Sequence, residues 1–189
     1  MELASGLKKT DFTSFTIKPL GSNAQYAIST LAFLQKYHQP EDQMFDEVGV
    51  QTTLFRRVSS AISIGPGLYF NSFAGFFERL SLSYSIQSSN IMLTVMPTIA
   101  HAEKTGTIDG EMFLQIQFTP SFKGGWKFLL STQMLTSWKG FSNHNRSFQQ
   151  LRAGFSKQDT QFGLAIDLDQ YGDSPITRTS LGLFIRRTF

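Results

Sequence analysis

Histidine, serine and carboxylate side chains are the residues of this chain best suited to chemistry. The three histidines, His38, His101 and His144, fall in polar segments that also contain acidic residues. A histidine beside a carboxylate can act as a general acid or base, which is the chemistry of hydrolysis. His144 and Ser147 add a base and a hydroxyl nucleophile, although no third residue that would orient them is evident. Histidines in polar loops are ordinarily solvated, so the sequence favours a protein without catalytic activity.

Other kinds of site find little support. The sequence has no glycine-rich phosphate loop, zinc motif or calcium loop, and its lack of cysteine excludes thiolate ligands and disulfides. We therefore expect no cofactor. The net charge is only +3 and the basic residues are scattered, which argues against nucleic acid as a partner.

The composition indicates strands rather than helices. Charged residues make up 16% of the chain, against roughly 25% in ordinary soluble domains. Phenylalanine occurs 19 times, and serine, threonine and glutamine are abundant. No apolar run reaches the ~18 residues that a membrane-spanning helix needs. A membrane-spanning helix therefore does not explain the small fraction of charged residues.

Apolar and polar residues alternate along most of the chain. Over residues 80–87 every even position is large and apolar and every odd one polar, and residues 90–100 alternate in the same way after a tight turn. We predict an all-β fold, a closed antiparallel transmembrane β-barrel of about ten strands, with eight or twelve as alternatives. The barrel is expected over residues 24–189, and an N-terminal tail or small plug over residues 1–23.

The polar face decides between a membrane barrel and a soluble one. In a soluble β-sandwich or lipocalin-like barrel the apolar faces would point inward and the polar face would carry many lysines and glutamates. Here that face is small, uncharged and rich in glycine, which suits a crowded lumen. The connections are expected to alternate in length, with the longer ones near residues 37–45, 71–77, 101–110, 137–146 and 170–175.

The end of the chain carries a family resemblance. Leu181, Leu183 and Ile185 are in phase with the terminal Phe189, and Gly182 lies among them. This pattern resembles the last strand of bacterial outer-membrane β-barrel proteins. The resemblance implies a Gram-negative, porin-like envelope protein, with this strand as the signal read by the barrel-assembly machinery. It also implies an integral outer-membrane location with both termini, and the tail of residues 1–23, in the periplasm.

Charged residues divide into two candidate groups. Those expected inside the lumen are Glu111, Lys127, Arg152, Asp167, Arg178 and Arg186. Those expected at the outer rim, where they would contact outer-membrane lipid and the phosphates of lipopolysaccharide, are Lys36, Arg79, Lys104, Lys139 and Arg146.

Three functions remain open from sequence. The first is a structural or interaction role, as a subunit of a larger envelope complex or a surface scaffold, with another envelope protein as partner. The second is a narrow passive channel for small solutes or ions. The third is a hydrolase at the rim, by analogy with the omptin proteases or the lipid A deacylases, which are also outer-membrane barrels.

Overall fold

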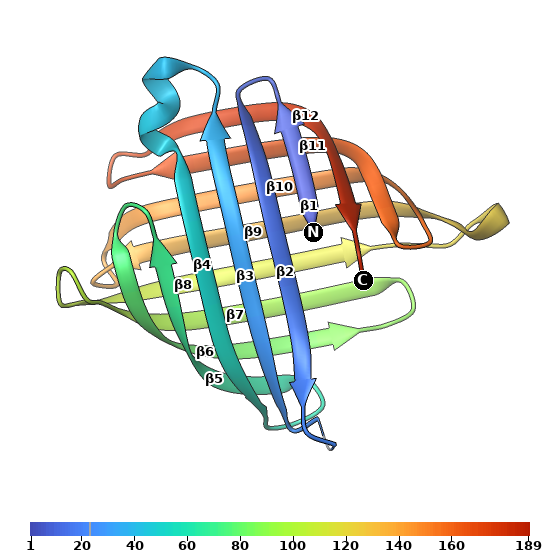
Figure 1. Ribbon diagram of the computed structural model, residues 1–189, viewed down its shortest axis with the longest axis horizontal. Helices are drawn as coiled ribbons and strands as arrows, with labels where there is room; N and C mark the ends of the chain where they lie inside the picture. Colours follow the sequence, from blue (N-terminus) through green and yellow to red (C-terminus); the bar gives the residue numbers. More distant parts are fainter. Residues whose placement is uncertain (23) are drawn as a thin grey trace.

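The chain forms one closed antiparallel β-barrel (Figure 1). The structure, a computed structural model, describes residues 1–22 and 24–189. Within that part the strands are β1 (Glu2–Gly6), β2 (Lys9–Leu20), β3 (Tyr26–Tyr37), β4 (Glu47–Arg57), β5 (Ile62–Asn71), β6 (Gly75–Gln87), β7 (Ile91–Ala102), β8 (Thr107–Phe118), β9 (Trp126–Lys139), β10 (Asn143–Lys157), β11 (Thr160–Tyr171) and β12 (Ile176–Arg187). Each strand pairs with its neighbours in sequence, and β1 pairs with β12 to close the barrel.

The barrel therefore has twelve strands in the described part of the chain, where about ten were expected and twelve was an alternative. The difference lies in residues 1–23, which were expected to form a tail or plug. β1 and β2 occupy that segment and belong to the barrel wall, while position 23 lies outside the described residues. The alternation of β2 was hidden because both of its faces are mixed: Phe15 and Ile17 share a face with Lys9 and Asp11.

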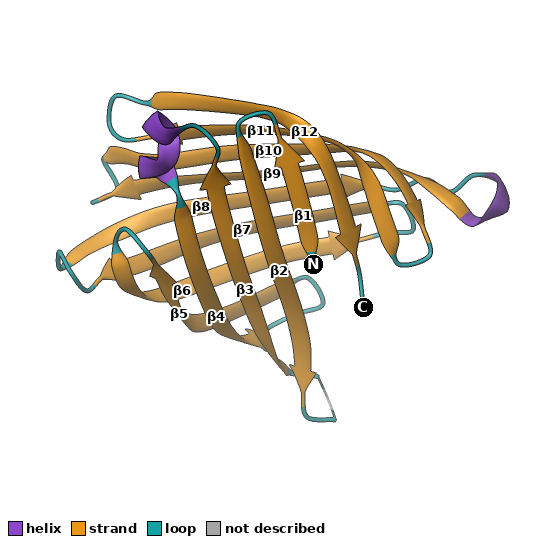
Figure 2. Cartoon of the chain, turned by 45° about the horizontal axis from the view of Figure 1, so that its top comes forward, coloured by secondary structure: helices purple, strands orange, loops and turns teal. Residues whose placement is uncertain are grey.

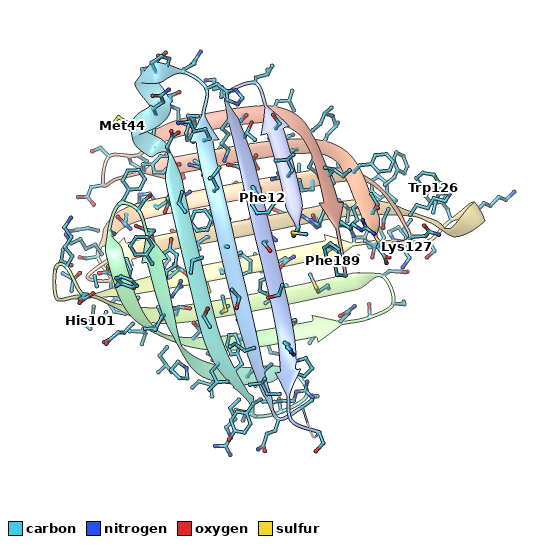
Figure 3. All side chains as sticks on the ribbon, in the orientation of Figure 1. Phe12, Met44, His101, Trp126, Lys127 and Phe189 are labelled. Atoms are coloured by element: carbon cyan, nitrogen blue, oxygen red, sulfur yellow. The ribbon has the colours of Figure 1, made fainter. Side chains whose placement is uncertain are left out.

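Side chains alternate between the lumen and the outside, as strand geometry requires. On β6 the outward Leu80, Leu82, Tyr84 and Ile86 are 41–50% exposed, whereas the inward Ser81 is fully buried. The same apolar outer face recurs around the wall, and the side chains that project from it surround the barrel in Figure 3. Every strand has two partners, although β1 is too short to reach the part of β2 beyond Thr13, which pairs with β3 alone. Paired backbone is the condition for strands to cross a bilayer.

Closure between β1 and β12 depends on small residues. Gly6 pairs with Gly182 at this seam. A Cβ atom on Gly182 would collide with the carbonyl oxygen of Ser5 and the Cα of Gly6, so glycine is required for the two backbones to approach.

The connections lie at two rims. The terminal rim contains Met1 and Phe189, which lie side by side in Figure 1, and the Met1 ammonium donates a hydrogen bond to the Arg187 carbonyl oxygen at 2.8 Å. The other rim, here called the distal rim, contains residues 38–46, which include the 3-10 helix η1 (Pro40–Phe45). Figure 2 shows η1 at one rim and the second 3-10 helix, η2 (Lys123–Gly125), projecting at the other.

The expected alternation of short and long connections is wrong. Four of the five predicted long loops are reduced to turns at residues 72–74, 103–106, 140–142 and 172–175. The strands continue into these segments because a polar residue near a strand end can still join the ladder of backbone hydrogen bonds. Only residues 38–46 form a longer connection at the distal rim among the described residues. No helix in the described ranges is long and apolar enough to span a membrane.

Candidate functional site

The lumen near the distal rim is filled by a cluster of charged and polar side chains. We call Lys9, Asp11, Glu47, Arg146 and Asp169 the distal cluster. The Lys9 Nζ atom lies 2.7 Å from Asp169 Oδ2 and 2.9 Å from Asp11 Oδ2. Lys9 and Asp169 are each 2% exposed, so these charges depend on one another for the stabilisation that water would otherwise provide.

One ion pair of this cluster crosses the lumen. Arg146 on β10 donates to the Glu47 carboxylate on β4. In the order of strands around the barrel, β4 and β10 are separated by β5–β9 on one side and by β11, β12, β1, β2 and β3 on the other. The two strands therefore lie opposite each other, and the Arg146–Glu47 pair bridges the barrel from wall to wall.

Residues 38–46 fold over the same end of the lumen. The Phe45 ring stacks on the Tyr171 ring with 4.5 Å between centroids, and Phe45 is only 7% exposed. Asp42 accepts a hydrogen bond from Arg178 Nε at 2.5 Å. Gln35 Nε2 donates to the Phe45 carbonyl oxygen at 3.0 Å. These contacts hold η1 against the distal cluster and cover it.

A second cluster lies closer to the terminal rim. Arg152 is 2% exposed, and it donates from Nε to Glu2 Oε1 at 2.9 Å and from Nη1 to Asp167 Oδ1 at 2.7 Å. Arg186 completes the group through a 2.5 Å contact with Glu2 Oε2. Both clusters include residues of β1 or β2, which anchor the N-terminal hairpin to the rest of the barrel.

A polar vestibule of about 230 Å³ lies at the terminal end of the lumen, and its lining includes the inward residues Gln87, Gln117, Lys127 and Gln161. Figure 3 shows Lys127 near the base of β9, at this rim. The lumen thus contains a polar vestibule at one rim and ion pairs toward the other.

The predicted lumen charges all lie on inward-facing positions or at the vestibule. Glu111 pairs with Arg79, Lys127 lines the vestibule, and Arg178 reaches Asp42. Arg152, Asp167 and Arg186 belong to the second cluster. Sequence reasoning missed Lys9, Asp11, Glu2, Asp42 and Glu47. Lys9, Asp11 and Glu2 lie in the N-terminal segment, where apolar and polar residues do not alternate clearly and strands are hard to predict. Asp42 and Glu47 lie in or beside η1.

Two of the predicted rim contacts are elsewhere. Arg79 is 6% exposed and bonds to Glu111 and Gln51 inside the barrel, and Arg146 faces Glu47 and Asp169. Neither is available to lipopolysaccharide on the outer surface. Lys36, Lys104 and Lys139 do lie at the distal rim, at a strand end or in a turn.

The histidines lie separately around the distal rim. His38 Nε2 is 3.0 Å from the Thr10 hydroxyl oxygen. His101 lies on the outer face, 3.4 Å from the Glu78 carboxylate, and Figure 3 shows it at the edge of the barrel. His144 is close to Ser147. No group of three or more potential metal-ligating side chains occurs among the residues that the structure describes.

The Lys36–Asp46 pair lies outside the barrel wall. Lys36 Nζ and Asp46 Oδ2 are 2.6 Å apart, and the Tyr37 backbone N–H donates to Asp46 Oδ1 at 2.7 Å. Partial burial raises the pKa of Asp46, but the hydrogen bonds from Lys36 and Tyr37 outweigh it and hold that pKa below its usual range.

Comparisons with known proteins agree with the barrel geometry. No protein-family model and no curated protein matches the sequence. Among solved structures, the NanC porin is similar over 100% of this chain and 97% of its own, with a TM-score of 0.55 and 9% sequence identity. The KdgM porin is similar over 100% of this chain and 96% of its own, with a TM-score of 0.52 and 8% identity.

At these identities the likeness concerns the fold alone: the chain has a closed antiparallel β-barrel fold similar to that of these two porins.

Proposed function

We propose that this chain is an integral outer-membrane barrel with a structural or interaction role and that its lumen is shut at the distal rim. The observation that carries the proposal is the Arg146–Glu47 pair, which joins opposite walls of the lumen. The covering segment around Phe45 and the Lys9–Asp169 pair fill the space beside it. A lumen blocked by buried, mutually paired charges is better suited to holding a rigid barrel than to passing solutes.

Conductance across planar bilayers tests the closed lumen. The purified full-length chain should give no reproducible conductance steps. The double variant R146A/E47A removes the bridge between the walls, and it should give measurable steps. Lys36→Ala, which changes a distal-rim charge outside the lumen, is the matched control and should remain silent. Regular steps from the unchanged protein would contradict the proposal.

A narrow channel is the second candidate, and one observation favours it. The vestibule at the terminal rim leads to a lumen lined with polar and charged residues, and the fold is that of porins. If the protein conducts, neutralising Arg152 or Asp167 should change the ion selectivity of the steps, because both side chains belong to the lumen wall.

Partners and orientation follow from the same proposal. We propose that the distal rim faces outward and both termini face the periplasm, so that Lys36, Lys104 and Lys139 are placed to meet lipopolysaccharide phosphates. A subunit role predicts that another envelope protein co-purifies in fixed ratio in mild detergent. A monomer alone in that preparation would count against the subunit role.

A further inference from the structure

Ser147 and His144 form a hydrogen-bonded pair at the distal rim. His144 Nε2 lies 2.8 Å from Ser147 Oγ, and His144 Nδ1 lies 2.7 Å from the carbonyl oxygen of Gly172. A carbonyl oxygen can only accept, so in the neutral ring Nδ1 carries the proton and the lone pair of Nε2 faces Ser147 Oγ. This is the tautomer that a histidine needs to act as a base toward a serine hydroxyl. Gly172 supplies the orienting group that the sequence did not reveal.

A bulge in β10 brings the two side chains to the same face. His144 pairs with Trp138 and Arg146 with Ser137, so Asn145 is an extra residue without a counterpart on β9. In a regular strand, residues three apart point to opposite faces. The extra residue shifts the alternation of side chains by one position, so that His144 and Ser147 both point outward. Bulges of this kind are common beside functional sites because they redirect one side chain.

Ser147 lies where the outer face changes from apolar to polar. It shares a row across the sheet with Thr136, Gln170 and Thr177, all polar. Two rows nearer the terminal rim, Leu151, Ile166 and Leu181 are apolar, with Thr132 beside them on β9. The pair therefore sits at the edge of the membrane-facing surface, at the level expected for lipid head groups and ester carbonyls rather than for acyl chains.

A surface hollow of about 450 Å³ adjoins the pair. Its lining includes His144, Asn143, Asn145, Lys139 and the turn residues Gly172 and Asp173, and it reaches Ser147 only through His144. The two amides and the ammonium are hydrogen-bond donors suited to carbonyl and phosphate oxygens. In the structure the Ser147 hydroxyl donates to the Thr136 hydroxyl oxygen at 2.9 Å, so it must rotate about its Cβ–Oγ bond before it can donate to His144 Nε2.

We propose that Ser147 and His144 are the nucleophile and base of a hydrolytic site for carboxylic esters of membrane lipids. Ser147 Oγ attacks the ester carbonyl carbon, and its proton passes to His144 Nε2. The bond from that carbon to the alkoxy oxygen breaks, and the leaving alcohol takes the proton from His144. Water then attacks the acyl-serine, giving up a proton to His144; the serine is released with that proton, and the product is a free fatty acid.

The test uses the full-length chain folded in detergent micelles and two readouts. The first is the rate at which an alkyl fluorophosphonate labels the protein, located by mass spectrometry of peptides. The second is hydrolysis of p-nitrophenyl decanoate. The variants are Ser147→Ala, His144→Ala and, as a control, Ser89→Ala, which changes an exposed serine in the turn between β6 and β7 at the opposite rim. Heat-modifiable migration on gels verifies that each variant is folded.

The unchanged protein and Ser89→Ala should be labelled on Ser147 and should hydrolyse the ester at similar rates. Ser147→Ala should lose both activities, and His144→Ala should slow both by about 100-fold or more, the usual size of a general-base contribution. A folded, unchanged protein that is neither labelled nor hydrolytic would overturn the proposal. So would labelling of Ser147→Ala at the unchanged rate.

Discussion

Loss of the arginine that bridges the lumen should strongly destabilise the barrel. In Arg146→Met the aliphatic stem remains, but Glu47, which is 3% exposed, keeps its charge without the guanidinium. Removing one partner of a buried ion pair typically costs about 3–5 kcal/mol, because the remaining charge is neither solvated nor paired. We expect a loss of that size in the free energy of unfolding.

The partner residue should be less sensitive. In Glu47→Gln, Arg146 still has the Asp169 carboxylate at 3.6 Å and Gln35 Oε1 at 3.4 Å, so its charge stays partly compensated. The double variant R146M/E47L removes both charges and should recover most of the loss, because replacing a whole buried pair by apolar side chains is often close to neutral.

Urea unfolding of the protein in phospholipid vesicles, followed by the fluorescence of its two tryptophans, measures these differences. Lys36→Ala is the control: its pair with Asp46 spans 2.6 Å but its side chain is 58% exposed. Exposed pairs contribute only about 0–1 kcal/mol. If Arg146→Met cost no more than Lys36→Ala, the cross-lumen pair would not be the stabilising contact that we infer.

Two further changes test the seam and the distal rim. Gly182→Val should prevent closure of β12 on β1, because its side chain would meet the Ser5 carbonyl; gel migration should show no folded form, whereas Thr179→Val on the outer face should fold. Asp46→Asn tests the lowered pKa of Asp46, which hydrogen bonds from Lys36 and Tyr37 hold below its usual range. Because the pKa is lower in the folded protein than in the unfolded chain, the Asp46 carboxylate stabilises the fold above its unfolded pKa. This stabilisation is lost as the pH falls through the folded pKa. The difference in unfolding free energy between Asp46→Asn and the unchanged protein should be constant above about pH 5 and shrink below about pH 4, near the ordinary aspartate pKa. A difference that grows on acidification would contradict this assignment.

Much of the fold could be predicted because alternation is a local property. The strand at residues 80–87 has one apolar and one polar face, and a closed sheet follows from the need to pair every strand in a bilayer. The N-terminal hairpin could not be predicted in this way. β2 carries Phe15 and Ile17 on its inner face and Thr10, Ser14 and Thr16 on its outer face, so neither face is recognisable by polarity.

The candidate sites were predictable only in part. The alternation of side chains along a strand predicts that Arg152 and Asp167 point inward. It does not predict which residues they pair with. Arg79 and Arg146 were assigned to the rim because sequence position near a loop says little about which face a residue occupies. The two arginines face the lumen, where each forms an ion pair with a carboxylate on another strand.

By itself the sequence determined the class of fold and the apolar outer surface, because these depend on the order of apolar and polar residues within single strands. Only the tertiary structure decided the strand number, the ion pairs across the lumen and the hydrogen bond between Ser147 and His144. Each of these depends on contacts between segments far apart in the chain, such as Glu47 with Arg146, or on a single extra residue, Asn145, that reverses the phase of a strand. Neither a long-range contact nor a single extra residue produces a periodic pattern in the sequence.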